Sequence, residues 1–178
     1  MSSSKYIISH TWDGNLCTPE EQITCSLSFK DNKLVFEFQA PFHNDPPPPP
    51  SSPKSLWGLW DFEVVEIFLV GHDGAYLEAE FGPHGHHLLL WLNAPREISK
   101  KHLPVDYTAK IQDNRWFGYA QIDRVHLPSP VHRFNIFAIH GTHEERRYLC
   151  YQALDTPKPD FHQPQRFPLL IKIPGLLP

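Results

Sequence analysis

The chain has few cysteines and no excess of positive charge, and each shortage argues against a class of protein. Its 178 residues include only three cysteines, and none of them forms a Cys-x-x-Cys spacing. An odd number in this arrangement matches neither a disulfide framework nor a cysteine zinc site, so we expect a reduced, intracellular protein. The net charge of −4 gives no reason to expect nucleic acid or an anionic membrane as a partner.

Long apolar runs and the common catalytic motifs are missing as well. No run approaches the roughly 20 apolar residues that span a bilayer. Residues 1–14 lack the apolar segment of a secretory signal, so we expect a cytoplasmic location. The sequence contains no Gly-rich phosphate loop and no Gly-x-Ser-x-Gly elbow, which favours a non-catalytic protein over an enzyme.

Proline, in contrast, is abundant, with 19 residues that cluster between apolar runs. Because proline breaks helices and is excluded from central strands, these clusters predict loops. Residues 41–55 form the most proline-rich loop, and the consecutive prolines at 46–50 favour polyproline II conformation. A protein–protein adaptor that presents this loop is one alternative function.

Short runs of alternating apolar and polar residues occur throughout the chain, separated by Gly, Pro, Asn and Asp. They predict about ten or eleven strands and no long helix. The length is within the range of one domain, so we expect a single domain over residues 1–178. This pattern is typical of an all-β protein, and we predict an antiparallel, jelly-roll-like β-sandwich.

The segment 57–93 has the strongest strand signal. Gly-bounded turns at 71–74 and 82–85 divide it into three runs rich in β-branched and aromatic residues, as in a three-stranded antiparallel meander. If these turns set the register, we predict that Glu78 lies opposite Trp91. Shifting that register by one residue would exchange the two faces.

One face of this meander is predicted to bind a ligand. Aromatic rings that stack on the C–H surface of a sugar, beside carboxylates that take its hydroxyls, suit a carbohydrate or a similar small polar molecule. The candidate ligand-binding residues are Trp57, Trp60, Tyr76, Glu78, Glu80 and Trp91, and Val65, Ile67 and Leu69 are expected on the same face. A half-exposed face whose glutamates are merely solvated is the alternative.

Two further acidic residues, Asp61 and Glu66, are predicted to be structural polar anchors. Glu66 shares a side with apolar neighbours in its strand. A buried carboxylate is costly unless it is hydrogen bonded, paired or bound to a metal. We therefore expect Glu66 to hold a neighbouring loop.

The 12 histidines and the paired glutamates leave a second interpretation open, that of a metal- or haem-binding protein or a hydrolytic enzyme. The metal-ligand candidates are His84, His86, His140 and His162, although zinc needs three or four convergent ligands. Glu78 and Glu80 stand two residues apart, which places their Cα atoms about 6.5–7 Å from each other, as a glycosidase pair could require. Under the main interpretation we expect no cofactor.

The meander also resembles a known fold family. Residues 59–69, followed by 76–80 and 83–85, are similar to family 9 carbohydrate-binding modules and the wider DOMON-like β-sandwiches. This resemblance implies a sandwich whose relatives bind sugars or haem in a cleft. The sugar-binding modules use a tryptophan pair, for which Trp57 and Trp60 are candidates. Haem-binding relatives often use a methionine ligand, and Met1 is the only methionine of this chain.

More of the chain resembles an uncharacterised family, that of human chromosome 4 open reading frame 33. The shared blocks lie at 10–14, 40–42, 45–47, in the meander, and at 134–135, 137–141 and 159–162. These blocks span nearly the whole chain. The resemblance implies the same DOMON-like fold and no known reaction.

Overall fold

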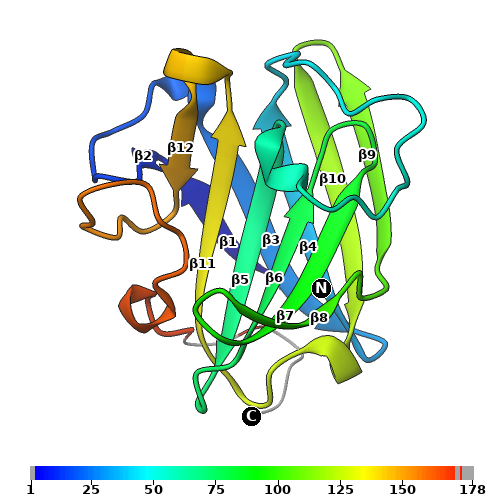
Figure 1. The fold of residues 1–178 in the computed structure, drawn as a ribbon, viewed down its shortest axis with the longest axis vertical. Helices are drawn as coiled ribbons and strands as arrows, with labels where there is room; N and C mark the ends of the chain where they lie inside the picture. Colours follow the sequence, from blue (N-terminus) through cyan, green and yellow to red (C-terminus); the bar gives the residue numbers. More distant parts are fainter. Residues whose placement is uncertain (1–2, 171–172, 174–178) are drawn as a thin grey trace.

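Two antiparallel β-sheets pack face to face in the computed structural model, which describes residues 3–170 and 173 (Figure 1). One sheet has five strands in the order β1-β3-β4-β10-β9, and the other has seven in the order β2-β12-β11-β5-β6-β7-β8. The predicted all-β antiparallel sandwich is confirmed. The described residues contain twelve strands, compared with the ten or eleven predicted, and their helices are short 3-10 turns.

The bounds of the elements follow the chain order within each sheet. The five-stranded sheet consists of β1 (Ser4–Ile8), β3 (Ile23–Lys30), β4 (Lys33–Pro41), β9 (Asp106–Gln112) and β10 (Arg115–Asp123). The seven-stranded sheet consists of β2 (His10–Thr11), β5 (Val64–Gly71), β6 (Tyr76–Phe81), β7 (His87–Ala94), β8 (Glu97–Lys101), β11 (Val131–His140) and β12 (Arg147–Cys150). The 3-10 turns are η1 (Pro19–Glu21), η2 (Leu59–Asp61), η3 (Arg124–His126), η4 (His143–Glu145) and η5 (Pro164–Arg166).

The main core lies between the sheets, where the central strands of each sheet bury alternate side chains. From the meander, Leu77, Ala79 and Phe81 enter this core, as the alternation predicts. On the facing sheet the ring of Phe38 meets Trp116 edge-on, with ring centroids 5.0 Å apart. Aromatic pairs in this geometry add to the stabilisation that burial alone gives.

Gly118 on β10 is required by the ring of Phe38, which folds over it from the paired strand β4. A Cβ atom at this position would lie 2.1 Å from Phe38 Cζ. We therefore expect Gly118→Ala to lower the free energy of unfolding by about 2 kcal/mol through overpacking, measured by urea denaturation. Gly82→Ala is the matched control, because its Cβ would meet only ordinary contacts of 3.5 Å or more. Equal stability of the two variants would contradict this packing.

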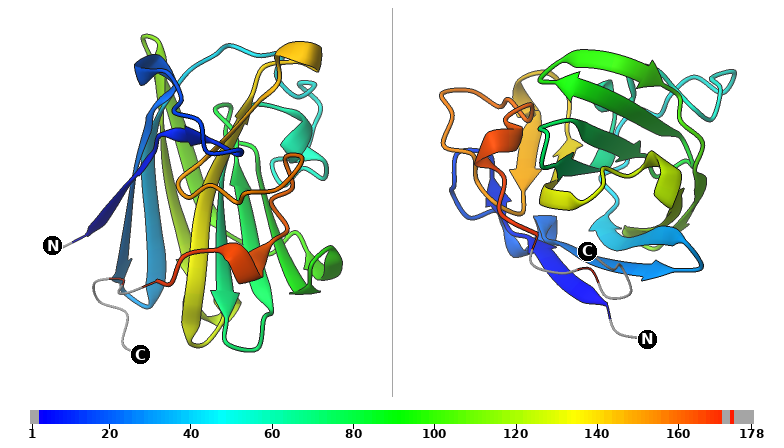
Figure 2. Two further views of the ribbon diagram at one scale, coloured as in Figure 1. Left: turned by 90° about the vertical axis from the view of Figure 1, so that its left-hand side faces the viewer. Right: turned by 90° about the horizontal axis from the view of Figure 1, so that it is seen from below.

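A second apolar layer covers the outer face of the seven-stranded sheet. Leu59 from η2 and Phe161 and Phe167 from the segment after β12 pack against Phe68 and its neighbours on that face. Figure 2 shows this late segment, in orange and red, running along the outside of β11. Residues 42–54, between β4 and η2, form neither helix nor strand. Within the described part of the chain, no helix is long and apolar enough to cross a membrane.

Candidate functional site

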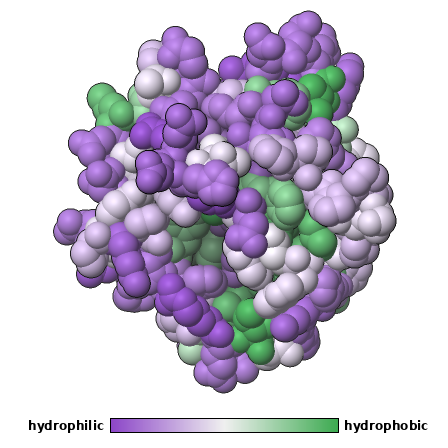
Figure 3. All heavy atoms as spheres, turned by 45° about the horizontal axis from the view of Figure 1, so that its top comes forward, coloured by the Kyte–Doolittle hydropathy of each residue, from purple (hydrophilic) through white to green (hydrophobic). Residues whose placement is uncertain are grey.

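A cavity of about 360 Å³ opens between the covering segments and the outer face of the seven-stranded sheet. Trp60 of η2 and Trp57, two residues before that turn, supply one wall, and residues 159–162 supply another. In Figure 3 the surface is hollowed near the middle of the view, where hydrophobic atoms are visible at depth among hydrophilic ones. The volume lies at the lower end of the about 300–1,000 Å³ that is usual for small-molecule sites.

The floor of the cavity is formed by β5, β6 and β7. Phe68 lies directly opposite Glu78, and Glu78 lies opposite Leu90. Because directly paired residues point to the same side of a sheet, all three side chains face the cavity, together with Glu66. The walls add the aromatic rings of Trp57, Trp60, Tyr148 and Phe161.

The predicted pairing of Glu78 with Trp91 is wrong by one residue. Phe81 pairs with His87 and not with Leu88, so the turn consists of residues 82–86, and Trp91 lies opposite Leu77. A shift of one residue moves a side chain to the other face. Trp91 therefore packs against the core between the sheets, away from Glu78.

The same correction applies to β5. Its turn to β6 spans residues 71–75 rather than 71–74, because Val70 pairs with Tyr76. The three β5 residues that were expected beside Glu78 point instead into the core between the sheets: Val65, Ile67 and Leu69.

The other predicted ligand-binding residues lie on or near the cavity. Trp57, Trp60 and Glu78 line it. Tyr76 and Glu80 are fully buried on the same side of β6 as Glu78. Whether they bind a ligand stays a prediction.

The two predicted anchors have different positions. Glu66 lines the cavity floor. Asp61 acts as an anchor through its main chain, since its carbonyl oxygen accepts a 3.0 Å hydrogen bond from Arg146 Nη1. Arg146 also donates to the carbonyl oxygens of Trp60 and Gly141. It thereby fastens η2, and with it the wall residue Trp60, to the loop between β11 and β12.

Three carboxyl groups meet at the floor. Glu66, Glu78 and Glu80 are 2%, 5% and 0% exposed. Burial raises the pKa of Glu78 to about 8. Burial, and then the neighbouring carboxyl groups, raise the pKa of Glu66 and Glu80 well above the ordinary value. All three are therefore held mainly in the protonated form at neutral pH.

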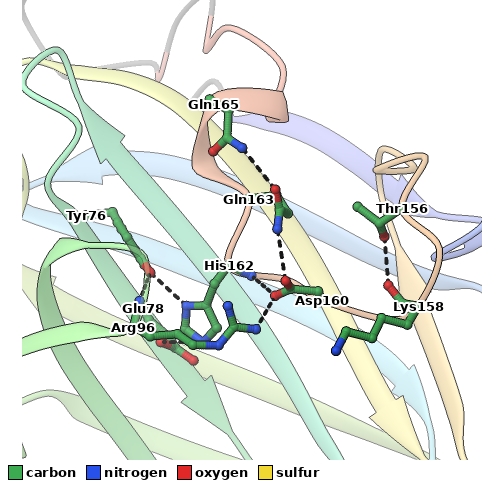
Figure 4. Close-up of polar contacts among 9 residues, drawn as sticks. All are labelled: Tyr76, Glu78, Arg96, Thr156, Lys158, Asp160, His162, Gln163 and Gln165. Atoms are coloured by element: carbon green, nitrogen blue, oxygen red, sulfur yellow. Dashed lines mark hydrogen bonds and ion pairs between the residues drawn. The ribbon is translucent and has the colours of Figure 1, made fainter.

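A polar network closes the side of the cavity formed by residues 159–162 (Figure 4). Arg96 Nη2 donates a 2.6 Å hydrogen bond to Asp160 Oδ1. The same oxygen accepts a 3.1 Å hydrogen bond from the main-chain N–H of His162. Gln163 Nε2 donates to the other oxygen of Asp160 at 2.9 Å. This network ties the chain after β12 to the β7–β8 turn, and so fixes the position of the wall.

His162 links this wall to the carboxyl groups. Burial, and then the nearby charge of Arg96, lower the pKa of His162 to about 4, so its ring is neutral. The Tyr76 hydroxyl oxygen lies 2.7 Å from His162 Nδ1 and accepts a 3.4 Å hydrogen bond from the main-chain N–H of Arg96. The hydroxyl proton is then free to be donated to Nδ1. We therefore assign the ring proton to Nε2, which faces Glu78 Oε2 at 4.0 Å.

Several residues of the site carry no signal in the sequence that would place them there. Arg96 and Asp160 are 64 positions apart, and nothing in the local pattern of either segment indicates their contact. Residues 159–162 form one of the family-like blocks, but the sequence alone gives them no place in the fold. Phe68 and Tyr148 follow ordinary strand patterns and give no separate signal.

The four histidines proposed as metal ligands are distributed over three places. His162 is at the cavity, His84 and His86 lie within the β6–β7 turn, and His140 contacts Glu21 at the far end of β11. Throughout residues 3–170 and 173, no group of three or more His, Cys, Asp or Glu side chains is arranged to hold a metal ion.

His140 belongs to a separate stacked pair with His43, whose rings are 3.6 Å apart and nearly parallel. Burial, and then the neighbouring His140, lower the pKa of His43 to about 4. The unfolded chain thus binds more protons than the folded one between about pH 6.5 and 4, so this pair loses stability as the pH falls through that window. Glu21, Asp45 and Arg147 are the charged groups that act on these two rings.

We expect His43→Phe, which keeps a stacking ring but cannot take up a proton, to lose less stability than the wild type between pH 6.5 and 4. The expected difference is about 1 kcal/mol, because partial exposure screens the charge. It is measured by urea denaturation at both pH values. His72→Phe is the control, since His72 stacks on His132 at the exposed surface. If the stability of His43→Phe and of the wild type changed with pH in parallel, the pKa of His43 would not be lowered by folding.

A larger depression of about 650 Å³ lies on the outer face of the five-stranded sheet, beside Glu37, Lys110, Phe117 and Tyr119. Its polar side chains alternate along the strands, as on a solvated face. Among the described residues, none of the buried polar atoms that lack a hydrogen-bond partner belongs to its lining. The smaller cavity contains such an atom, Glu78 Oε2, and we therefore take it as the candidate site.

The fold defines the class of protein. A candidate carbohydrate-binding protein from Bacteroides uniformis superposes with a TM-score of 0.73 at 10% identity, over 93% of this chain and 84% of its own. A family 9 carbohydrate-binding module from Caldicellulosiruptor kristjanssonii, solved with cellotriose, gives a TM-score of 0.51 at 12% identity, over 84% and 72%. These likenesses establish a carbohydrate-binding-module-like β-sandwich, as the resemblance implied.

Relatives at higher identity define the family. The chain is 37% identical to human UPF0462 protein C4orf33, over 87% of this chain and 81% of that protein. It is 38% identical to the Rattus norvegicus homologue, over 90% and 84%. The chain therefore belongs to the UPF0462 family of C4orf33-like proteins, as its sequence blocks predicted. No protein-family model matches it.

Proposed function

We propose that the protein binds a small carbohydrate, or a similar polar molecule, in the cavity above β5 and β6 without changing it chemically. The observation that carries this proposal is the combination of aromatic walls with a carboxyl floor. Trp57 and Trp60 meet edge-to-face, with ring centroids 4.9 Å apart, at one side of the cavity. Such rings offer flat apolar surface to a sugar, while Glu66 and Glu78 offer partners for its hydroxyls.

The relatives support the ligand class. The module from Caldicellulosiruptor kristjanssonii, which shares the fold, was solved with cellotriose. The cytoplasm is the proposed setting, where Cys17, Cys25 and Cys150, all buried and unpaired, would be stable as thiols.

Binding is favoured over hydrolysis by the state of the two carboxyl groups that face the cavity. A glycosidase pair needs one protonated and one ionised member. Burial acts on Glu66 and Glu78 in the same direction and raises the pKa of both. These two groups therefore lack the contrast on which acid and base roles depend.

Calorimetry against a panel of mono- and oligosaccharides, including cellotriose, tests the proposal. Ile98→Trp places a large ring at the cavity, on edge strand β8, and we expect it to reduce binding at least about tenfold by filling the site. Ile111→Trp is the matched control, because Ile111 lies on edge strand β9 of the other sheet and does not line the cavity. The absence of heat with every saccharide, or equal affinity in the two variants, would overturn the proposal.

A further inference from the structure

The carboxyl cluster at the cavity floor has an unusual composition. Glu66 and Glu80 are paired directly across β5 and β6, and Glu78 stands two residues along from Glu80 on the same face. Glu78 Oε2 and both carboxyl oxygens of Glu80 are buried and have no hydrogen-bond partner among the described residues. Burying polar atoms in this way is costly, and native proteins rarely leave them unsatisfied.

The cations that face this cluster already have partners. Arg146 acts on Glu66 from the β11–β12 loop, but its guanidinium donates to the carbonyl oxygens of Asp61, Trp60 and Gly141. Arg96, from the β7–β8 turn, is paired with Asp160 at 2.6 Å.

The remaining neighbours of the cluster do not supply a free cation either. His162 is neutral, and the carboxylate of Asp61 adds a further acidic group near Glu80. The main-chain N–H of Trp60 acts to lower the pKa of Glu80, but it forms no hydrogen bond of normal geometry with the carboxyl group. The floor is therefore a cluster of protonated carboxyl groups to which no cation of the described residues is paired.

The aromatic wall beside the cluster accommodates cations. The ammonium of Lys101 lies 3.9 Å from the ring centroid of Trp57. The guanidinium of Arg146 lies 5.9 Å from the ring centroid of Tyr148. Aromatic rings grouped around a positive charge are a recurrent way of recognising ammonium ligands. The wall and the floor thus favour the same kind of ligand.

We infer that the cavity selects a ligand with an ammonium group, and among carbohydrates an amino sugar with a free amine. The inference rests on the proposed function and specifies the ligand class of the same site. The ammonium would lie against the rings of Trp57, Trp60 and Tyr148 and form a charge-assisted hydrogen bond with Glu78. On binding, the Glu78 carboxyl releases its proton to the solvent, and the carboxylate pairs with the ammonium.

This exchange makes binding depend on pH in a defined direction. Because Glu78 has a pKa of about 8, its proton must leave when an ammonium binds at pH 6–7. Release of one proton per ligand raises the affinity about tenfold for each pH unit in that range, as long as the amine stays charged. A neutral sugar releases no proton, and its affinity stays flat over the same range.

Calorimetry with the full chain tests the inference. The probes are D-glucosamine and its β-1,4-linked dimer, compared with D-glucose and cellobiose, at pH 6 and 7 in two buffers of different ionisation enthalpy. We expect D-glucosamine to bind at least about tenfold more tightly than D-glucose at pH 7, with release of about one proton. Glu78→Gln, which mimics the protonated carboxyl, should abolish both the preference and the pH dependence. Glu37→Gln, on the outer face of the other sheet, should change neither.

The outcomes separate the inference from the proposed function. Equal affinities for the charged and neutral sugars, with no proton release, overturn the inference and leave the carbohydrate site in place. A preference that survives in both Glu78→Gln and Glu66→Gln also overturns it, because the carboxyl groups would then not be responsible. If none of the four sugars binds but another saccharide of the panel does, the inference fails and the proposed function stands; if no saccharide of the panel binds, both fail.

Discussion

Glu78→Gln is expected to be more stable than the wild type at pH 9 and nearly equal to it at pH 5. Burial raises the pKa of Glu78 from its ordinary 4.5 to about 8, so the folded protein holds a proton that the unfolded chain has released. That contribution is complete below about pH 4.5 and is lost as the pH rises towards 8. At about 1.4 kcal/mol per pKa unit, the wild type loses about 3–5 kcal/mol that glutamine, which does not ionise, retains.

Urea denaturation at pH 5, 7 and 9 measures this difference directly. Glu37→Gln is the control, since Glu37 is an exposed glutamate on β4 and lies away from the cavity. The folded Glu78 would have to be ionised at neutral pH if Glu78→Gln and the wild type lost stability in parallel. That outcome would contradict a protonated carboxyl cluster at the cavity floor.

Trp57→Ala and Trp60→Ala are each expected to weaken saccharide binding at least about thirtyfold. Each removes one of two rings that together form a wall of the cavity, and large aromatic side chains carry a disproportionate share of binding energy at such sites. Calorimetry with the tightest-binding saccharide of the panel measures the loss.

The matched control for the tryptophan variants is Phe117→Ala. Trp57 is 44% exposed and Phe117 is 40% exposed, so the two substitutions remove comparable aromatic surface from opposite sides of the molecule. We expect Phe117→Ala to bind as the wild type does. A loss of binding in Phe117→Ala, with normal binding in both tryptophan variants, would move the site to the depression on the five-stranded sheet.

Much of the fold could be predicted because it depends on local chemistry. Alternating apolar residues identified the strands, and the Gly-bounded turns identified the meander. The glycines within those turns, Gly74 and Gly85, have φ values of +85° and +82°, a conformation that other residues rarely adopt. Turn chemistry thus located the reversals, but it did not state how many residues each reversal uses.

That missing residue count explains the error at Trp91. The turn between β6 and β7 is closed by a hydrogen bond from Gly82 N to His86 O and holds the five residues 82–86, whereas the pairing of Glu78 with Trp91 requires six. The sequence of the turn fits both lengths, and the difference decides which side of the sheet Trp91 occupies. Glu66 illustrates a related ambiguity, since a buried carboxyl looks the same in sequence whether it anchors a loop or lines a cavity.

The walls of the site depend on contacts between distant segments. Phe161 stacks on Phe137 with ring centroids 4.0 Å apart, which holds residues 159–162 against the sheet. This contact joins a segment without regular structure to a strand more than twenty residues earlier. No periodicity in the sequence predicts it, so the cavity became visible only in three dimensions.

The indole N–H signals in a ¹H–¹⁵N correlation spectrum test the central claim most directly. The chain has five tryptophans, of which Trp57 and Trp60 line the cavity, whereas Trp91 and Trp116 pack between the sheets. On addition of D-glucosamine or cellotriose, we predict that the Trp57 and Trp60 signals shift and saturate while those of Trp91 and Trp116 stay in place. Unchanged Trp57 and Trp60 signals with both ligands would contradict a carbohydrate site in this cavity.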